Sequence, residues 1–274
     1  MDIFGIDFTS RPSRRKPLTL ARCVLDGERL DFVAMDALPT FAEFERLLRV
    51  PGPWIAALDF PFGHARRFVE GIGWPLDWAG YVATAHRLGR DGYRQALETY
   101  KADRPVGDKE HRRAADRLAA SISPQKLYGV PVALMFFEGA PRLVASGVTV
   151  PGLQTGDPQR IVVEGYPGIV ARQLIGRRSY KNDDRARQTP ALLESRHALL
   201  AALRAQSVAR YGIVVEAPDA IADDPSGDQL DAFICAVQAA WAWRRREQGF
   251  GMPADIDPVE GWITDPHVTG ETSR

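Results

Sequence analysis

Five acidic residues stand where the chain should leave a strand or enter a helix. Asp7, Asp59 and Glu164 each close a short apolar run, and Asp228 and Asp231 lie one helical turn apart at the start of an apolar segment. Two carboxylates about 4 Å apart repel by roughly 4 kcal/mol at an effective dielectric near 20. If these side chains converge, they must take up protons or hold a cation.

Carboxylate oxygens without nitrogen or sulfur ligands suit Mg²⁺ or Mn²⁺. Two such ions about 3.5–4 Å apart can activate a water and stabilise the leaving oxygen in phosphodiester cleavage. Zinc is not expected, because the histidines show no H-E-x-x-H spacing. A serine nucleophile is not expected either, because no G-x-S-x-G elbow is present.

The strand predicted within residues 1–10, with Asp7 at its end, opens a set of three. Residues 18–25 and 29–35 flank Asp26-Gly27, a dipeptide typical of tight hairpin turns, so three antiparallel strands are expected in succession. Residues 54–59 and 160–164 repeat the opening design and carry Asp59 and Glu164. If the strands of Asp7, Asp59 and Glu164 are neighbours, their acids lie on one edge of the sheet.

Helices are predicted around these strands. Thr40 can cap a helix at about 41–48, a helix is expected at 169–175, and a long amphipathic helix is expected at 191–211. Ser226 with Gln229 fits a capping box for the apolar helix that ends near Trp243. Residues 132–137 fit either a strand or a helix.

The predicted fold class is α/β, with a mixed sheet of three antiparallel strands followed by parallel strands, flanked by helices. One domain is expected over 1–248, with a helical insertion at about 64–130 and an irregular, partly mobile tail at 249–274.

Composition excludes some classes of function. Thirty-five basic and 35 acidic residues give no net field toward nucleic acid or membrane. No apolar run approaches about 20 residues, so no membrane span is expected. Cys23 and Cys235 stand alone in apolar surroundings, which indicates buried thiols in a reducing compartment, and we expect a cytoplasmic protein.

The order of these segments resembles the ribonuclease-H-like fold. The likeness is carried by Gly5-Ile6-Asp7, Leu58-Asp59-Phe60-Pro61, Glu164-Gly165-Tyr166-Pro167, and Gly227-Asp228 through Asp231-Ala232. Together with Ser123-Pro124, Lys181 and Glu260-Gly261-Trp262-Ile263, these segments resemble domain-of-unknown-function family 429, a group of predicted nucleases, over nearly the whole chain.

The resemblance implies roles for individual residues. Asp7 would be the central metal ligand, Asp59 and Glu164 its companions, and Asp228 or Asp231 the ligand borne by a helix. Lys126 and Lys181 are candidates for contacting a phosphate, and nucleic acid is the implied substrate.

Other interpretations stay open for the same residues. Asp59 could cap a turn, Glu164 could pair with an arginine, and Asp228 and Asp231 could simply occupy a first helical turn. The basic clusters, such as Arg112-Arg113, would ordinarily be solvated faces, and the aromatic residues of 74–100 would ordinarily form the core of the insertion.

Two functions rival a nuclease. An ATP-binding phosphotransferase related to actin and sugar kinases also places a phosphate loop after a Gly-Ile-Asp strand, but Phe8 stands where that loop needs a glycine. A binding module without catalysis could keep the fold and bind no metal.

Overall fold

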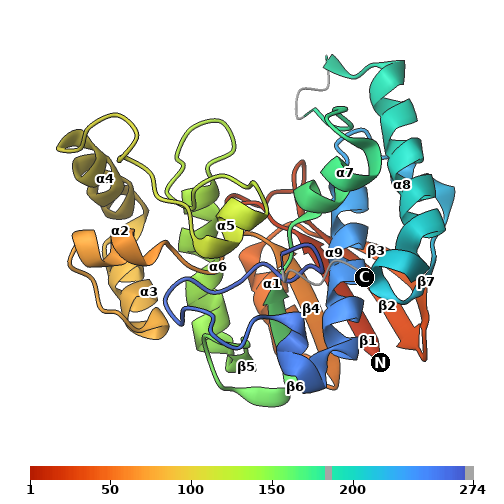
Figure 1. The fold of residues 1–274 in the computed structure, drawn as a ribbon, viewed down its shortest axis with the longest axis horizontal. Helices are drawn as coiled ribbons and strands as arrows, with labels where there is room; N and C mark the ends of the chain where they lie inside the picture. The colour runs from red at the N-terminus through yellow and green to blue at the C-terminus, as the bar shows by residue number, and fades with distance from the viewer. Residues whose placement is uncertain (183–186, 269–274) are drawn as a thin grey trace.

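The computed structural model describes residues 1–182 and 187–268. Within them, one seven-stranded sheet has the order β5-β6-β4-β1-β2-β3-β7 (Figure 1). Its strands are β1 (Asp2–Asp7), β2 (Leu18–Asp26), β3 (Arg29–Leu38), β4 (Trp54–Asp59), β5 (Val148–Thr149), β6 (Asp157–Glu164) and β7 (Val214–Glu216).

The pairing confirms the predicted α/β class and the change of direction within the sheet. Strands β1, β2 and β3 are antiparallel in succession, whereas β4 and β6 run parallel to β1. The hairpin between β2 and β3 pairs Asp26 with Arg29, so Gly27 and Glu28 form its two-residue loop. Gly27 has a φ of 57°, a left-handed conformation that glycine adopts without strain.

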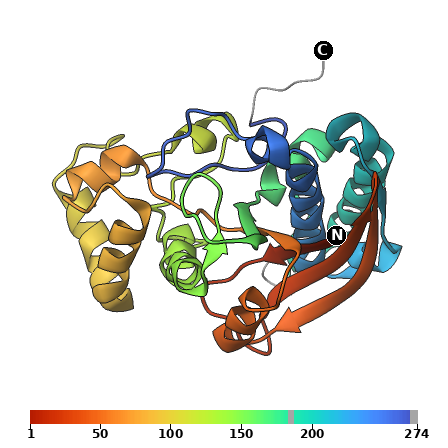
Figure 2. The ribbon, with the colours of Figure 1, turned by 90° about the horizontal axis from the view of Figure 1, so that it is seen from below.

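Helices cover both faces of the sheet (Figure 2). They are α1 (Phe41–Leu48), α2 (Arg66–Gly71), α3 (Trp78–Arg87), α4 (Gly89–Ala102), α5 (Ala114–Leu118), α6 (Val132–Ser146), α7 (Pro167–Ile175), α8 (Pro190–Tyr211) and α9 (Asp228–Arg244). Short 3₁₀ turns, η2 (Asp219–Asp223) and η3 (Arg246–Gly251), flank α9. None of the helices in the described ranges is both long and apolar enough to cross a membrane.

Alternation along the strands divides the core in two. Ile3, Ile55 and Ile161 point to the face covered by α7, α8 and α9, which we call the α9 face. Phe4 and Val162 point to the opposite face, covered by α1 and α6, which we call the α6 face. A residue's place in its strand therefore decides which face its side chain reaches.

In the stretch expected to be a helical insertion, α2, α3 and α4 lie to one side of the sheet, beside α6 (Figure 1). The aromatic residues of this stretch form the core, as expected: Tyr81 stacks on Phe136 with ring centroids 5.9 Å apart, and Tyr93 lies 6.2 Å from the same ring. Residues 132–137, which fitted either a strand or a helix, begin α6.

The segment after η3 is irregular but closely packed. Arg66 forms two hydrogen bonds with Asp257 at 2.6 and 2.7 Å, and the Glu260 carboxylate accepts from the backbone N–H groups of Arg66 and Ala114. Ile263 forms a parallel bridge with Glu164 at the end of β6. Up to residue 268, this segment therefore packs against the rest of the protein and pairs with the end of β6.

Helix α9 lies directly on the sheet because β1 carries a glycine beneath it. A Cβ on Gly5 would stand 2.0 Å from the carbonyl oxygen of Ala232 and 2.2 Å from the backbone nitrogen of Ala236. Only a residue without a side chain fits there. This close approach brings the first turn of α9 to the end of β1.

The start of α9 differs from the predicted capping box. The helix begins at Asp228, and Gly227 at its N-cap position has no side chain to contribute. Instead, the Asp224 carboxylate accepts from the Ser226 hydroxyl at 2.7 Å and from the Gln229 backbone N–H at 3.1 Å. Asp224 thus binds both Ser226 and Gln229, the two residues predicted to form the capping box, so the box does not form.

Candidate metal centre

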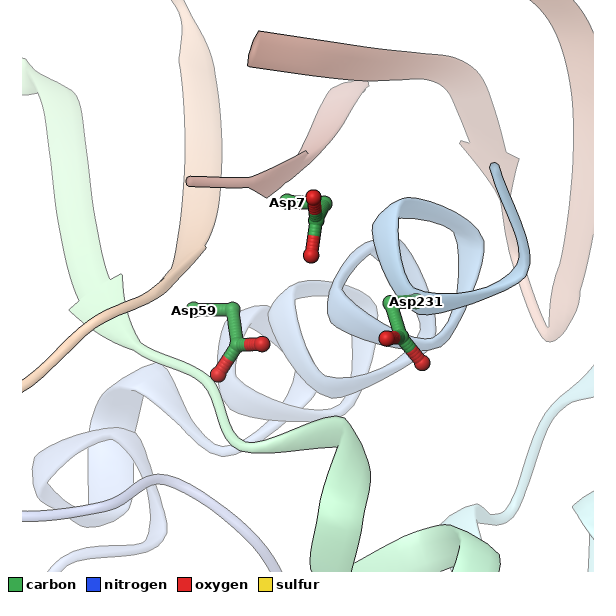
Figure 3. A group of neighbouring side chains, drawn as sticks. All are labelled: Asp7, Asp59 and Asp231. Atoms are coloured by element: carbon green, nitrogen blue, oxygen red, sulfur yellow. The ribbon is translucent and has the colours of Figure 1, made fainter. Parts of the chain in front are cut away.

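Three carboxylates meet at the carboxyl edge of the sheet (Figure 3). Asp7 ends β1 and Asp59 ends β4, and the two are direct neighbours in the parallel register. Asp231 reaches them from the first turn of α9. One ligand oxygen from each of the three residues lies within 4.8 Å of the others, and we call this group the acid cluster.

The acid cluster is strongly perturbed electrostatically. Burial raises the pKa of Asp7 well above its ordinary value, and Asp228, Asp231 and Asp59 add to the shift while Lys181 opposes it. Burial also raises the pKa of Asp59 to about 7, with Asp231 adding to that shift. The surroundings therefore disfavour two neighbouring negative charges unless a cation joins them.

Asp231 is fully buried and is held from both sides. The Tyr180 hydroxyl donates to its Oδ1 at 2.6 Å, and the Lys181 ammonium donates to its Oδ2. Burial alone would lower the pKa of Lys181, but Asp231 raises it well above the ordinary value, so the ammonium stays charged. Sequence reasoning identified Lys181 but missed Tyr180, the residue just before it.

Within residues 1–182 and 187–268, no hydrogen bond or ion pair is made by the carboxylate of Asp7 or of Asp59. Two such carboxylates, close together and with raised pKa values, have the donor chemistry that a hard divalent cation requires. The residues present therefore fit Mg²⁺ or Mn²⁺, which Asp7, Asp59 and Asp231 could hold.

Asp228 stands one helical turn before Asp231 but outside the acid cluster. Its backbone N–H donates to Ser226 Oγ at 3.3 Å, and burial raises the pKa of its carboxyl. It is only partly buried and lines a groove of about 780 Å³ together with Thr19 and Arg15. Of the two helix acids that the sequence left open, Asp231 is the one that meets Asp7 and Asp59.

Glu164 lies on the same edge of the sheet as Asp7 and Asp59 but points to the other face. In the parallel register it neighbours Leu58 and not Asp59, so its side chain leaves the sheet on the α6 face. There Arg113 donates to both of its oxygens, at 2.7 and 2.5 Å, and the Phe62 N–H donates to Oε2 at 2.9 Å. The structure does not bring Glu164 into the acid cluster; it has the arginine partner that was the alternative interpretation.

Arg113 is the centre of this second group of charges. Its guanidinium and backbone N–H also donate to Asp116, which accepts from Ser121 as well. Burial alone would lower the pKa of Arg113, but Asp116 and Glu164 raise it well above the ordinary value. The sequence pattern of Arg112-Arg113 indicated a solvated face; Arg112 is exposed, whereas Arg113 is buried. The only sequence signal was an acid three residues after Arg113.

A pocket of about 250 Å³ opens between Asp59 and this second group, and Lys126 is part of its lining. Lys126 Nζ lies 5.1 Å from the centroid of the Tyr128 ring. Lys126 thus lines the same pocket as Asp59, whereas Lys181 contacts the acid cluster directly.

The sequence matches the family model described as "Protein of unknown function (DUF429)" over residues 5–257. No curated protein and no solved structure matches the chain. The matched range contains every acidic residue of both charged groups. The chain belongs to this family of unknown function.

Proposed function

We propose that the protein is a divalent-metal-dependent phosphodiesterase that cleaves nucleic acid, with the ribonuclease-H-like arrangement that its sequence resembles. The observation that carries the proposal is the acid cluster, in which Asp7, Asp59 and Asp231 offer oxygens within 4.8 Å of one another. Carboxylates from two adjacent strand ends and one helix hold this geometry without flexible loops.

Each residue has a defined part in this proposal. Asp7, Asp59 and Asp231 hold Mg²⁺ or Mn²⁺, which supplies Lewis acidity and lowers the pKa of a coordinated water. Tyr180 keeps Asp231 in its rotamer through the 2.6 Å hydrogen bond. Lys181, whose side chain is 40% exposed, presents a positive charge that suits a phosphate oxygen at the mouth of the cluster.

The test combines metal binding and cleavage. We expect isothermal titration calorimetry with Mn²⁺ to show binding that Asp7→Asn removes, and labelled DNA, RNA and branched DNA to include at least one substrate cleaved only with metal. Asp2→Asn is the matched control, because Asp2 is an exposed aspartate at the other end of the same strand. Absence of Mn²⁺ binding by the folded wild-type protein would rule the proposal out.

A further inference from the structure

We propose that the pocket beside Asp59, which we call the base pocket, takes one unstacked nucleobase, so that the substrate is a single-stranded polynucleotide and not a continuous duplex. This inference rests on the proposed function and specifies its substrate class. It depends on the place of the pocket, its size and the chemistry of its walls.

The base pocket adjoins the acid cluster. Asp59 contributes to both, and Gly165, the residue just after β6, forms part of the wall next to it. A group bound in the pocket is therefore next to whatever the acid cluster holds. In a polynucleotide, a base is likewise next to the phosphate of its own nucleotide.

The pocket is small and mostly apolar. Its volume of about 250 Å³ lies below the range of roughly 300–1,000 Å³ typical of sites for drug-sized ligands, so it fits one ring system and not a stacked pair of bases. Phe60, Ile122, Val132 and Met135 supply apolar surface. A flat, weakly hydrated group such as a nucleobase suits such walls.

Apart from Asp59, which belongs to the acid cluster, the acids in the wall of the pocket are satisfied internally. Both oxygens of Glu164 accept from Arg113, and both oxygens of Asp116 do the same. Ser121 donates its hydroxyl proton to Asp116 at 2.8 Å. These groups are already paired, so the wall is poorly suited to reading the edge of a base, and we infer binding with little sequence preference.

The rim carries charge and exposed apolar side chains. Lys126 provides a cation for a phosphate, and Tyr128 next to it is 66% exposed. On the other side of the acid cluster, beyond β1 in the sheet order, the groove at Asp228 contains Arg15 and Lys16 together with the acids Asp36 and Asp224. A strand that runs from this groove across the acid cluster to the base pocket meets basic residues at both ends.

A base enters such a pocket only when it has left its stack. In a duplex, unstacking and unpairing cost a few kcal/mol, whereas a single strand offers its bases without breaking pairs. The geometry therefore favours single strands over duplexes of the same sequence.

The test uses a fluorescein-labelled 12-nucleotide single strand, as DNA and as RNA, and the matching duplex. Binding is measured by fluorescence anisotropy in the Asp7→Asn background, which prevents turnover. We expect the single strand to bind at least tenfold more tightly than the duplex. A 2-aminopurine in the strand should change its fluorescence on binding, because that base moves into the pocket.

Two variants probe the pocket itself. Val130→Asp, at a rim position that is 50% exposed, should weaken single-strand binding about tenfold, and Met135→Trp, which fills the pocket from α6, should do the same. Leu118→Asp is the control matched in charge, because Leu118 is 60% exposed and lies outside the pocket lining; it should bind within twofold of the parent.

The outcomes separate this inference from the proposed function. Equal binding of duplex and single strand, or equal effects of Val130→Asp and Leu118→Asp, would overturn the base pocket even if Mn²⁺ binds to the acid cluster. Single-strand binding that Val130→Asp and Met135→Trp weaken would support the base pocket even if Mn²⁺ does not bind, and the proposed function would then fail alone.

Discussion

The carboxyl edge of the sheet carries two groups of largely buried acids, one on each face, and the two groups differ in how far their carboxylates are paired. On the α6 face, Glu164 and Asp116 surround Arg113, and each of their four oxygens accepts at least one hydrogen bond. On the α9 face, three carboxylates lie near the ammonium of Lys181, and of these three only Asp231 forms an ion pair with it within the described residues.

This difference shows which group is suited to chemistry. A buried charge that is paired and hydrogen-bonded stabilises one conformation, and removing one partner is costly. Buried carboxylates without partners raise the energy of the apo protein and gain most when a cation binds. We therefore expect the α6-face group to stabilise the fold, and the α9-face group is the candidate metal centre.

Neutralising one acid on each face is the strongest test of the difference between the two groups. Asp59→Asn should lower metal-dependent cleavage on the order of 1,000-fold or more, since several kcal/mol of charge stabilisation are lost. Glu164→Gln should keep cleavage within about tenfold and lower the melting temperature instead. Single-turnover rates and thermal melts of both variants measure the contrast; equal losses of cleavage would contradict the division between the faces.

The α6-face group should dominate stability. Arg113→Met leaves Glu164 and Asp116 buried without their cation, so we expect a loss of about 3 kcal/mol or more in the free energy of unfolding. Urea denaturation followed by circular dichroism gives the value. Arg112→Met, at the exposed neighbour, is the control and should change stability by less than about 0.5 kcal/mol.

The α9-face group should make the apo protein sensitive to pH. Folding raises the pKa of Asp59 from an ordinary 3.8 to about 7, so the folded state keeps a proton that the unfolded chain releases first. Stability is therefore fully present below about pH 4 and is lost as the pH rises toward 7. We expect a decrease of about 2 kcal/mol, less than the full shift gives, because Asp59 is partly exposed.

Urea denaturation with EDTA at several pH values measures how the free energy of unfolding of the apo protein changes with pH. The pH dependence of stability belongs to the whole group, because other charges also affect the pKa of Asp59. These charges are on Asp7, Asp231, Glu164, Asp228 and Lys181. Asp59→Asn should remove much of the pH dependence. Saturating Mn²⁺ should reverse it, because the cation binds the ionised carboxylates. A slope unchanged in Asp59→Asn would assign the pH effect to other residues.

The smallest effect is expected for the second helix acid. Asp228→Asn should weaken Mn²⁺ binding about tenfold or less, because Asp228 lies outside the acid cluster and acts through its charge. Asp231→Asn should remove binding. Calorimetry on the pair decides between the two acids, and equal losses would place Asp228 among the ligands.

Much of this arrangement could be predicted from local patterns. Apolar runs that end on Asp7 and Asp59 identify buried strands, and the periodicity before Trp243 identifies the helix that delivers Asp231. The common edge for the strand acids followed from treating those strands as parallel neighbours, and the register confirms it.

The face of the sheet could not be predicted. Glu164 ends its strand as Asp59 does, but in the register between β4 and β6 it pairs with Leu58, one residue before Asp59. A shift of one residue along a strand moves the side chain to the opposite face of the sheet. The buried position of Arg113 depends on tertiary packing between segments 51 residues apart, which no local pattern encodes. Ser226 lost its predicted role because the carboxylate of Asp224, two residues earlier in the chain, is a stronger acceptor for the Gln229 backbone N–H.

Gly5 has a consequence that reaches beyond packing. The backbone of α9 packs against Gly5, where even a methyl group would collide with Ala232 and Ala236. The distance between helix and sheet is therefore set by main-chain contact and has the thickness of two main chains. The separation of Asp231 from Asp7 follows from that thickness. Adding a single carbon at Gly5 would push the helix outward and widen the ligand cage without changing any acid, so the reactivity of the centre depends on a residue that has no functional group.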